Sequence, residues 1–146
     1  MSANPHSNND PRLHHIGFVV ADLEASAPGM ARALMTEWNK EVIIDPLQRV
    51  KVTFLCGGYQ SPLIELVEPL GDESPVRRFL IEKRGGLHHL CYEVLSLEKN
   101  LARIRAGGGV IVSRPKPAVA FGGRPIAWAM TREKLLLEFL QAVAAV

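Results

Sequence analysis

Leu87-His88-His89-Leu90-Cys91-Tyr92-Glu93-Val94 repeats the pattern of an earlier stretch, Leu13-His14-His15-Ile16-Gly17-Phe18-Val19-Val20. A second pair of stretches matches in the same way: Leu63-Ile64-Glu65-Leu66-Val67 and Leu136-Leu137-Glu138-Phe139-Leu140. His15 and His89 are 74 positions apart, and Glu65 and Glu138 are 73 positions apart. Two matching pairs at nearly one spacing indicate an internal duplication, so the chain is interpreted as two similar halves.

Both halves show the same order of expected elements, which is a strand, a helix and three further strands. The strands are expected at 15–20, 42–44, 50–54 and 63–67, and again at 87–94, 110–113, 126–130 and 135–140. Asp22 and Ser96 are suitable caps for the two helices. The first helix is expected to run to about Trp38 and, because Pro28 lacks an N–H, to begin near Ser26. Between the halves, Ser74 is expected to cap a linking helix.

The duplication predicts an α+β fold of two paired βαβββ modules that form a curved sheet around a metal cleft, because one such sheet cannot cover its own concave face. The expected organisation is a disordered tail over 1–12, a first module over 13–70, a linking helix over 71–86 and a second module over 87–146. Together these segments make one domain, as the length of 146 residues suggests.

The bulk composition is that of an ordinary globular protein, with 47% apolar and 22% charged residues. A net charge of +2 is too small to argue for nucleic acid as a partner. No apolar run reaches the ~20 residues of a membrane helix, and the polar N-terminus lacks the apolar stretch of a signal peptide. We therefore expect a cytoplasmic protein, with Cys56 and Cys91 as reduced core residues.

The repeated His and Glu residues carry the functional prediction. In a strand, alternate residues share a face. Glu65 therefore shares its strand face with apolar residues, and so does Glu138 on its strand. A carboxylate in such surroundings is costly unless it is paired or bound to a metal. We therefore predict that His15, Glu65, His89 and Glu138 converge on one divalent metal ion, for which Zn, Co, Ni, Mn or Fe is suitable. His14 and His88 are expected to point to the opposite face.

These residues resemble the vicinal oxygen chelate superfamily, which includes glyoxalase I, extradiol dioxygenases, bleomycin-binding proteins and methylmalonyl-CoA epimerases. The stretches look most like those of the epimerases. The matching segments are His15-Ile16-Gly17, Ile64-Glu65-Leu66-Val67-Glu68-Pro69-Leu70, Asp72-Glu73-Ser74-Pro75-Val76, Gly86-Leu87-His88-His89-Leu90, Gly122-Gly123-Arg124 and Leu136-Leu137-Glu138. The resemblance implies a glyoxalase-like fold and a divalent metal held by His15, Glu65, His89 and Glu138.

The implied activity is metal-assisted proton transfer next to a carbonyl, in an isomerase or lyase with Glu138 as the base. The implied partners are a small-molecule substrate, such as an acyl thioester, and a second copy of the chain in a homodimer. Val52 departs from the resemblance, because it aligns with a second acidic residue of the epimerases and cannot transfer protons. We therefore expect exchange of a substrate proton to be much faster than epimerisation.

Three other functions stay open. A dioxygenase would use two His and one carboxylate, and Glu65 argues against it because it fills a fourth position. A non-catalytic small-molecule binding protein, like the bleomycin-binding proteins, would lack the four ligands. A divergent biosynthetic enzyme acting on a carrier-bound acyl group is compatible with the loss of the acid at Val52.

Overall fold

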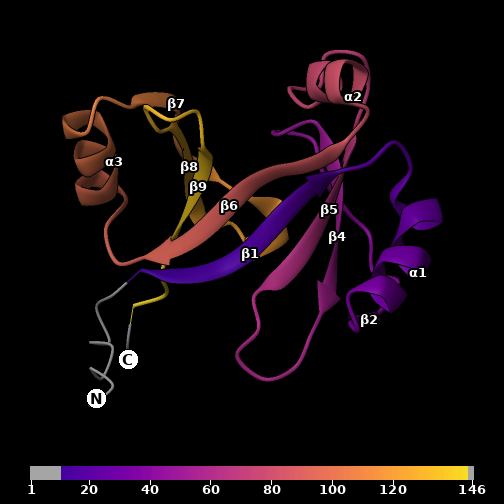
Figure 1. The fold of residues 1–146 in the computed structure, drawn as a ribbon. Coiled ribbons are helices and arrows are strands. Elements are labelled where there is room, and N and C mark those ends of the chain that lie inside the picture. Colours follow the sequence, from indigo (N-terminus) through magenta and orange to yellow (C-terminus); the bar gives the residue numbers. More distant parts are fainter. Residues whose placement is uncertain (1–10, 145–146) are drawn as a thin grey trace.

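One mixed sheet runs through the whole of the computed structural model, which describes residues 11–144 (Figure 1). The strands of the first half are β1 (Arg12–Val19), β2 (Glu37–Trp38), β3 (Ile43–Asp45), β4 (Val50–Cys56) and β5 (Leu63–Pro69). Those of the second half are β6 (Gly86–Val94), β7 (Val110–Pro117), β8 (Pro125–Met130) and β9 (Leu136–Gln141). The helices are α1 (Leu23–Ala33), α2 (Arg77–Lys83), α3 (Leu97–Ala106) and the short 3₁₀ turn η1 (Val119–Phe121).

The two halves meet where β1 pairs with β6 in antiparallel orientation. The strand order is β2-β4-β5-β1-β6-β9-β8-β7, with β3 continuing the edge beside β4. In each half the first strand pairs in parallel with the last, β1 with β5 and β6 with β9. Helices α1 and α3 each contact the strands of their own half. The predicted α+β architecture of paired modules in a curved sheet is confirmed.

Helix α1 differs from its predicted boundaries at both ends. Asp22 caps it as predicted, because its side chain accepts a hydrogen bond from the Ala25 N–H, and this cap lets the helix begin at Leu23 with Pro28 inside it. The helix ends at Ala33, since Met35 adopts a left-handed backbone with φ of 53°. The prediction that helix continues to Trp38 is wrong: this residue lies in β2, where its indole N–H donates to the Thr53 hydroxyl at 2.8 Å.

Four smaller predictions also need correction. Ser74 does not cap the linking helix, which begins at Arg77 without a side-chain cap. Cys56 is exposed, whereas Cys91 is buried as predicted. Arg12 belongs to β1 and not to the predicted tail, of which residues 1–10 lie outside the described part of the chain. The strand predicted at 110–113 is longer than expected, because β7 continues to Pro117 through two irregularities in its pairing with β8.

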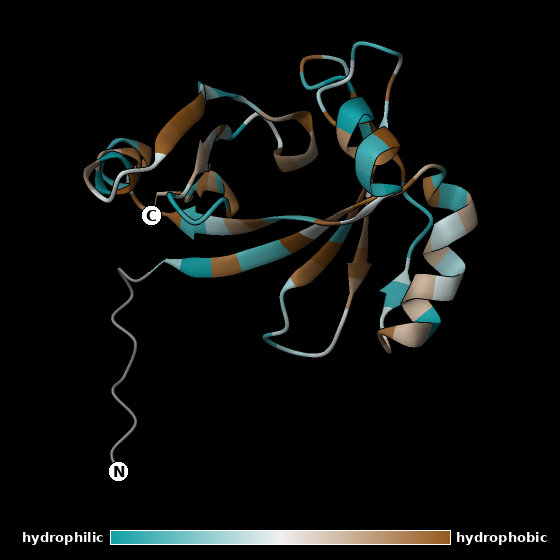
Figure 2. Ribbon diagram, turned by 45° about the horizontal axis from the view of Figure 1, so that its top comes forward, coloured by the Kyte–Doolittle hydropathy of each residue, from teal (hydrophilic) through white to brown (hydrophobic). Residues whose placement is uncertain are grey.

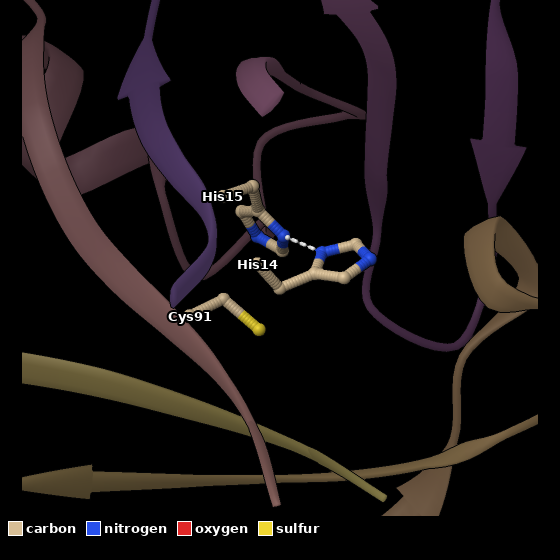
Figure 3. A group of neighbouring side chains, drawn as sticks. All are labelled: His14, His15 and Cys91. Carbon is tan, nitrogen blue, oxygen red and sulfur yellow. Dashed lines mark hydrogen bonds between the residues drawn. The ribbon is translucent and has the colours of Figure 1, made fainter. Parts of the chain in front are cut away.

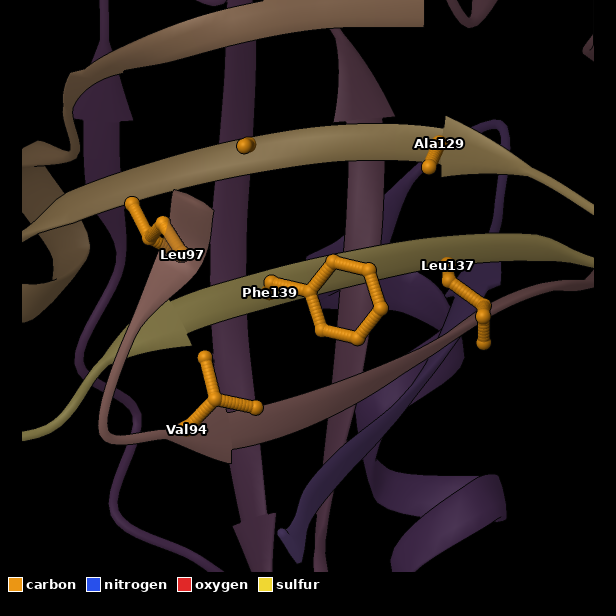
Figure 4. Packing of buried hydrophobic residues seen from close by; sticks show 6 residues of the cluster. Val94, Leu97, Ala129, Leu137 and Phe139 are labelled. Atoms are coloured by element: carbon orange, nitrogen blue, oxygen red, sulfur yellow. The ribbon is translucent and has the colours of Figure 1, made fainter. Parts of the chain in front are cut away.

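The hydrophobic core has two parts. One part lies between the sheet and helices α1 and α3, and the other lies on the concave side of the sheet. Hydrophobic and hydrophilic residues alternate along the central strands, so each strand presents an apolar face to its helix (Figure 2). In the second half, α3 and the strands beside it bury the cluster shown in Figure 4, which includes Val94, Leu97, Ala129, Leu137 and Phe139. Burying one such large side chain contributes roughly 1.5–3 kcal/mol. Within residues 11–144, the helices are too short or too polar to cross a membrane.

Thr53 provides a test of the packing at the β2–β4 edge. Its buried hydroxyl accepts from the Trp38 indole and donates to the Glu41 carbonyl. Thr53→Val keeps the shape but leaves both partners without a hydrogen bond, so the free energy of unfolding should fall by about 1–3 kcal/mol. Urea denaturation followed by tryptophan fluorescence measures this change. Thr36→Val, at a partly exposed hydroxyl with a long 3.4 Å bond, is the control and should cost less.

Candidate metal centre

Four buried side chains from the two halves meet on the inner side of the sheet. His15 lies on β1, His89 on β6, Glu65 on β5 and Glu138 on β9, and each is at most 5% exposed. The Nε2 atoms of His15 and His89 are 3.2 Å apart. Glu65 Oε1 lies 3.4 Å from the His89 nitrogen and 3.7 Å from the His15 nitrogen, and Glu138 Oε1 lies 3.6 Å from the His15 nitrogen. The structure thus brings together the four residues that the repeat singled out.

Strand register explains why these side chains converge. Gly17 on β1 faces His89 on β6 and Glu65 on β5, and Cys91 on β6 faces His15 on β1 and Glu138 on β9. The two halves therefore contribute equivalent positions across the β1–β6 pair. A Cβ atom at Gly17 would overlap the imidazole ring of His89. The glycine is required here because the ring occupies the space that any side chain would fill.

His14 and His88 do not point away from the site, and that prediction is wrong. The β1–β6 register skips one residue at each of these positions, so each is the additional residue of a β-bulge. The bulges turn two consecutive side chains toward the same side. Figure 3 shows the result at the His14 bulge, where the rings of His14 and His15 face each other beside Cys91. The Nδ1 atoms of the two rings are 2.9 Å apart.

Cys91 lies beside these histidines, and its thiol is neutral when no ion is bound. Its sulfur and the nitrogens of His14 and His15 lie within 4.8 Å of one another. A thiol binds a metal as the thiolate. Burial, and then the charge of Glu138, raises the pKa of the Cys91 thiol far above its usual value. In the ion-free protein Cys91 is therefore a neutral neighbour of the metal centre.

Burial and neighbouring charges shift the pKa values of the two buried histidines and the two buried glutamates in different directions. Burial lowers the pKa of His15 to about 4. Burial also opposes the charge on His89, but the hydrogen bond and charge of Glu65 outweigh it and raise the pKa of His89. Burial disfavours the charged form of Glu65, yet the two histidines hold its pKa below the usual value. Burial, reinforced by the charge of Glu65, raises the pKa of Glu138 to about 7.

The residues fit a divalent metal ion. Two ligands that each lie about 2.1 Å from an ion at a tetrahedral angle are roughly 3.4 Å apart. The candidate ligand atoms of His15, Glu65 and His89 are 3.2–3.7 Å apart, and Glu138 joins this group through its 3.6 Å approach to His15. Glu138 Oε1 is buried and has no hydrogen-bond partner among the described residues. A buried carboxylate oxygen without a partner is costly, and a cation would satisfy it. Two imidazoles and two carboxylates suit Zn, Co, Ni, Mn or Fe(II).

A cavity of about 430 Å³ opens onto these groups. Glu65, His89, Glu138 and Val52 form part of its wall. Sequence reasoning missed other wall residues, which are Asp45, Gln48, His88, Lys116, Phe121 and Trp128. Only the position of Asp45 before a proline, at the end of an apolar run, could have drawn attention, and that pattern equally marks a turn.

Two polar contacts hold the halves together over this cavity. Asp45 accepts hydrogen bonds from the backbone N–H of Gln48 at 3.0 Å and of Val119 at 3.4 Å. The Trp128 indole donates to the Gln48 side chain at 3.3 Å. Asp45 and Gln48 lie in the first half, and Val119 and Trp128 lie in the second. The Asp45–Val119 and Gln48–Trp128 contacts therefore tie the β3 edge to the second half. Both carboxylate oxygens of Asp45 are used in this way.

Comparisons with known proteins agree with this geometry. The sequence family described as the Glyoxalase/Bleomycin resistance protein/Dioxygenase superfamily matches residues 5–128. An ethylmalonyl-CoA/methylmalonyl-CoA epimerase of Cereibacter sphaeroides is 34% identical over 117 residues, which cover 79% of this chain and 84% of that protein. A hypothetical protein of Bacillus halodurans has a similar structure, with a TM-score of 0.79 and 26% identity over 94% of this chain and 98% of that one. The crystal structure of a methylmalonyl-CoA epimerase from Mycobacterium tuberculosis has the same fold, with a TM-score of 0.78 at 22% identity over 91% and 89% of the two chains.

The glycine beside His89 should be necessary for the metal site. In Gly17→Ala the new methyl group displaces the His89 ring, so zinc affinity measured by competition with a chelator should fall by at least roughly 10-fold, as when a ligand is misplaced. Gly29→Ala is the matched control, because a Cβ there meets nothing within 4 Å. That change should leave zinc affinity unaltered and, inside a helix, stabilise the fold by roughly 0.5–1 kcal/mol.

Removing one ligand charge should reduce metal binding without unfolding the chain. We expect wild-type protein to hold one divalent ion per chain and Glu65→Gln to hold much less, because an amide oxygen is neutral and a weaker ligand. Elemental analysis after dialysis against limiting zinc measures the difference. Glu133→Gln, the same substitution at an exposed position, should retain the wild-type content. Equal metal content in the two variants would remove Glu65 from the ligand set.

Proposed function

The chain belongs to the Glyoxalase/Bleomycin resistance protein/Dioxygenase superfamily, and on that premise we propose that it is a metal-dependent enzyme that moves a proton at a carbon next to a carbonyl. We further propose that the carbonyl is that of an acyl thioester. The observation that supports this most directly is a buried group of two histidines and two glutamates, three of which, Glu65, His89 and Glu138, line one cavity. The names of the relatives, which are epimerases of methylmalonyl-CoA or ethylmalonyl-CoA, support the substrate class.

His15, Glu65, His89 and Glu138 are the residues that would hold the ion. When bound there, a divalent metal supplies Lewis-acid chemistry, which makes a C–H bond beside a carbonyl more acidic. Little water reaches these four side chains, because each is at most 5% exposed and Val50, Val52 and Val67 form part of the cavity wall. A dry environment strengthens the electrostatic interactions made there.

Glu138 is the residue best suited to be the base. In the ion-free protein its pKa, raised by burial and by Glu65 to about 7, lies close to neutral pH, where a general base works most effectively. It lines the cavity, so a substrate can reach it. Glu65 is less suitable, since contacts with both histidines hold its pKa low and tie its carboxylate in place. We therefore assign proton removal to Glu138 and anchoring of the ion to Glu65.

Inversion of a stereocentre requires proton removal on one face and delivery on the other. Val52 faces the cavity and cannot transfer a proton. Asp45 also lines the cavity, but both of its oxygens already accept backbone hydrogen bonds. A single free base supports exchange of a proton, and also elimination or isomerisation, better than epimerisation. An acyl group on a carrier protein is a second substrate that this reasoning allows, since it has the same thioester.

Deuterium exchange separates these activities. Protein loaded with zinc or cobalt in heavy water should incorporate deuterium next to the carbonyl of methylmalonyl-CoA about 100- to 10,000-fold faster than it inverts that centre, because one acid–base group is missing. Mass spectrometry and chiral analysis of the same samples give both rates. Inversion at on the order of 10 per second or more would show an efficient epimerase and contradict this expectation.

Glu138→Gln tests the base in the same assay. Exchange should fall by about 100-fold or more relative to Glu133→Gln, because the amide cannot accept the proton. Metal content must be measured alongside, since Glu138 is also a proposed ligand. A Glu138→Gln protein that holds metal and still exchanges at the wild-type rate would exclude Glu138 as the base.

A further inference from the structure

We propose that His14 and His88 are positioning residues that orient the two metal-binding histidines. Each accepts a hydrogen bond from the Nδ1–H of the following histidine and so leaves that residue's Nε2 free for the ion. The inference rests on the proposed metal centre, but it makes a separate claim about where protons lie in four imidazole rings. It also gives a function to the two β-bulges, which the metal ligands alone do not require.

The bulges bring each histidine beside its neighbour. In a regular strand consecutive side chains point to opposite faces, so His14 could not reach the ring of His15. The register of β1 with β6 skips at Leu13/His15 and at Gly17/Phe18, the latter opposite His88. The same irregularity therefore occurs at corresponding places in both halves. Bulges of this kind often re-aim a side chain beside a functional site.

The contact geometry is the same in both pairs. The Nδ1 atoms of His14 and His15 are 2.9 Å apart, and those of His88 and His89 are also 2.9 Å apart. The ring planes are nearly perpendicular, at 78° and 89°. A nitrogen–nitrogen distance of 2.9 Å is that of a hydrogen bond, so one of the two atoms carries a hydrogen and the other accepts it.

The direction of each hydrogen bond follows from what lies on the other side of the ligand rings. Nε2 of His15 and Nε2 of His89 face the glutamates and each other. A histidine binds a metal through an unprotonated nitrogen, so a ligand that uses Nε2 carries its hydrogen on Nδ1. His15 and His89 are therefore the donors. His14 and His88 are the acceptors, with their own hydrogens on Nε2.

Aromatic packing holds the accepting rings in place. His14 packs edge-on against Phe121, with ring centroids 5.3 Å apart at an interplanar angle of 88°. His88 packs in the same manner against Phe79, at 4.9 Å and 84°. An acceptor fixed in this way limits rotation of the ligand ring. Outer groups that orient metal-binding histidines typically change metal affinity by 10- to 100-fold when they are removed.

Nitrogen-15 NMR of the metal-free and zinc-loaded proteins tests the proton positions directly. The chain contains 5 histidines, so the long-range spectrum of the imidazole rings is simple to assign with single variants. We expect Nδ1 to be protonated in His15 and His89, and unprotonated in His14 and His88, with and without zinc. Ligand histidines protonated only on Nε2 in the metal-free protein would overturn the proposal.

Substitution gives a second readout that simple packing would not. In His14→Asn and His88→Asn the amide oxygen takes the place of Nδ1 as an acceptor, whereas His14→Leu and His88→Leu fill the space without one. Zinc affinity should fall by about 10- to 100-fold in the leucine variants and return to within a few-fold of wild type in the asparagine variants. Leucine variants that fold and bind zinc as tightly as wild type would refute the role, as would asparagine variants as weak as leucine.

These outcomes separate the positioning role from the metal centre itself. If wild-type protein binds no zinc, cobalt or other divalent ion, the proposed function fails. The proton positions in the metal-free protein still test the hydrogen bonds between the paired histidines. If wild type binds an ion and the leucine variants are unaffected, the metal centre stands and the positioning role is wrong.

Discussion

The antiparallel pairing of β1 with β6 is the constraint on which the rest of the structure depends. It joins the two halves into one sheet, and its register sets Gly17 opposite His89 and Cys91 opposite His15. The parallel partners β5 and β9 then place one glutamate beside each of these crossings. A shift of this pairing by a single residue would turn the histidine and glutamate of one half to the opposite face from those of the other half. The functional site is thus a consequence of one strand register.

That register brings together buried polar groups that repel one another or lose their contact with water. Two carboxylates and two imidazoles are removed from water within a few ångströms, and Glu138 Oε1 has no hydrogen-bond partner in the part of the chain that the structure describes. Buried charged groups without full partners destabilise a fold. The surrounding strands and the packed helices α1 and α3 supply the apolar burial that offsets this cost. A cation at the centre would convert the same arrangement from a cost into a source of stability.

The sequence predicted the parts of this structure that follow from periodicity and repetition. The order of strands and helices, the cap at Asp22 and the four converging side chains could all be inferred, because alternation and duplication are visible in the chain. What could not be inferred depends on partners distant in sequence. A bulge arises from pairing between strands, so His14 and His88 were given the wrong face. Trp38 enters a strand because Thr53 and β4 lie beside it, which a helical pattern does not reveal.

The two halves are related by sequence but no longer equivalent in chemistry, and the difference begins with one pair of residues. At corresponding positions the first half has Gly17 and the second has Cys91. The glycine lets the His89 ring lie over β1, where it contacts Glu65 at 3.4 Å, so that Glu65 interacts with both histidines and its pKa is lowered. Glu138 lies beside Cys91 instead, and burial, reinforced by the charge of Glu65, raises its pKa to about 7. In the proposed function, an internal repeat that would otherwise give two identical carboxylates therefore gives Glu65, which would hold a cation, and Glu138, which would exchange a proton near neutral pH.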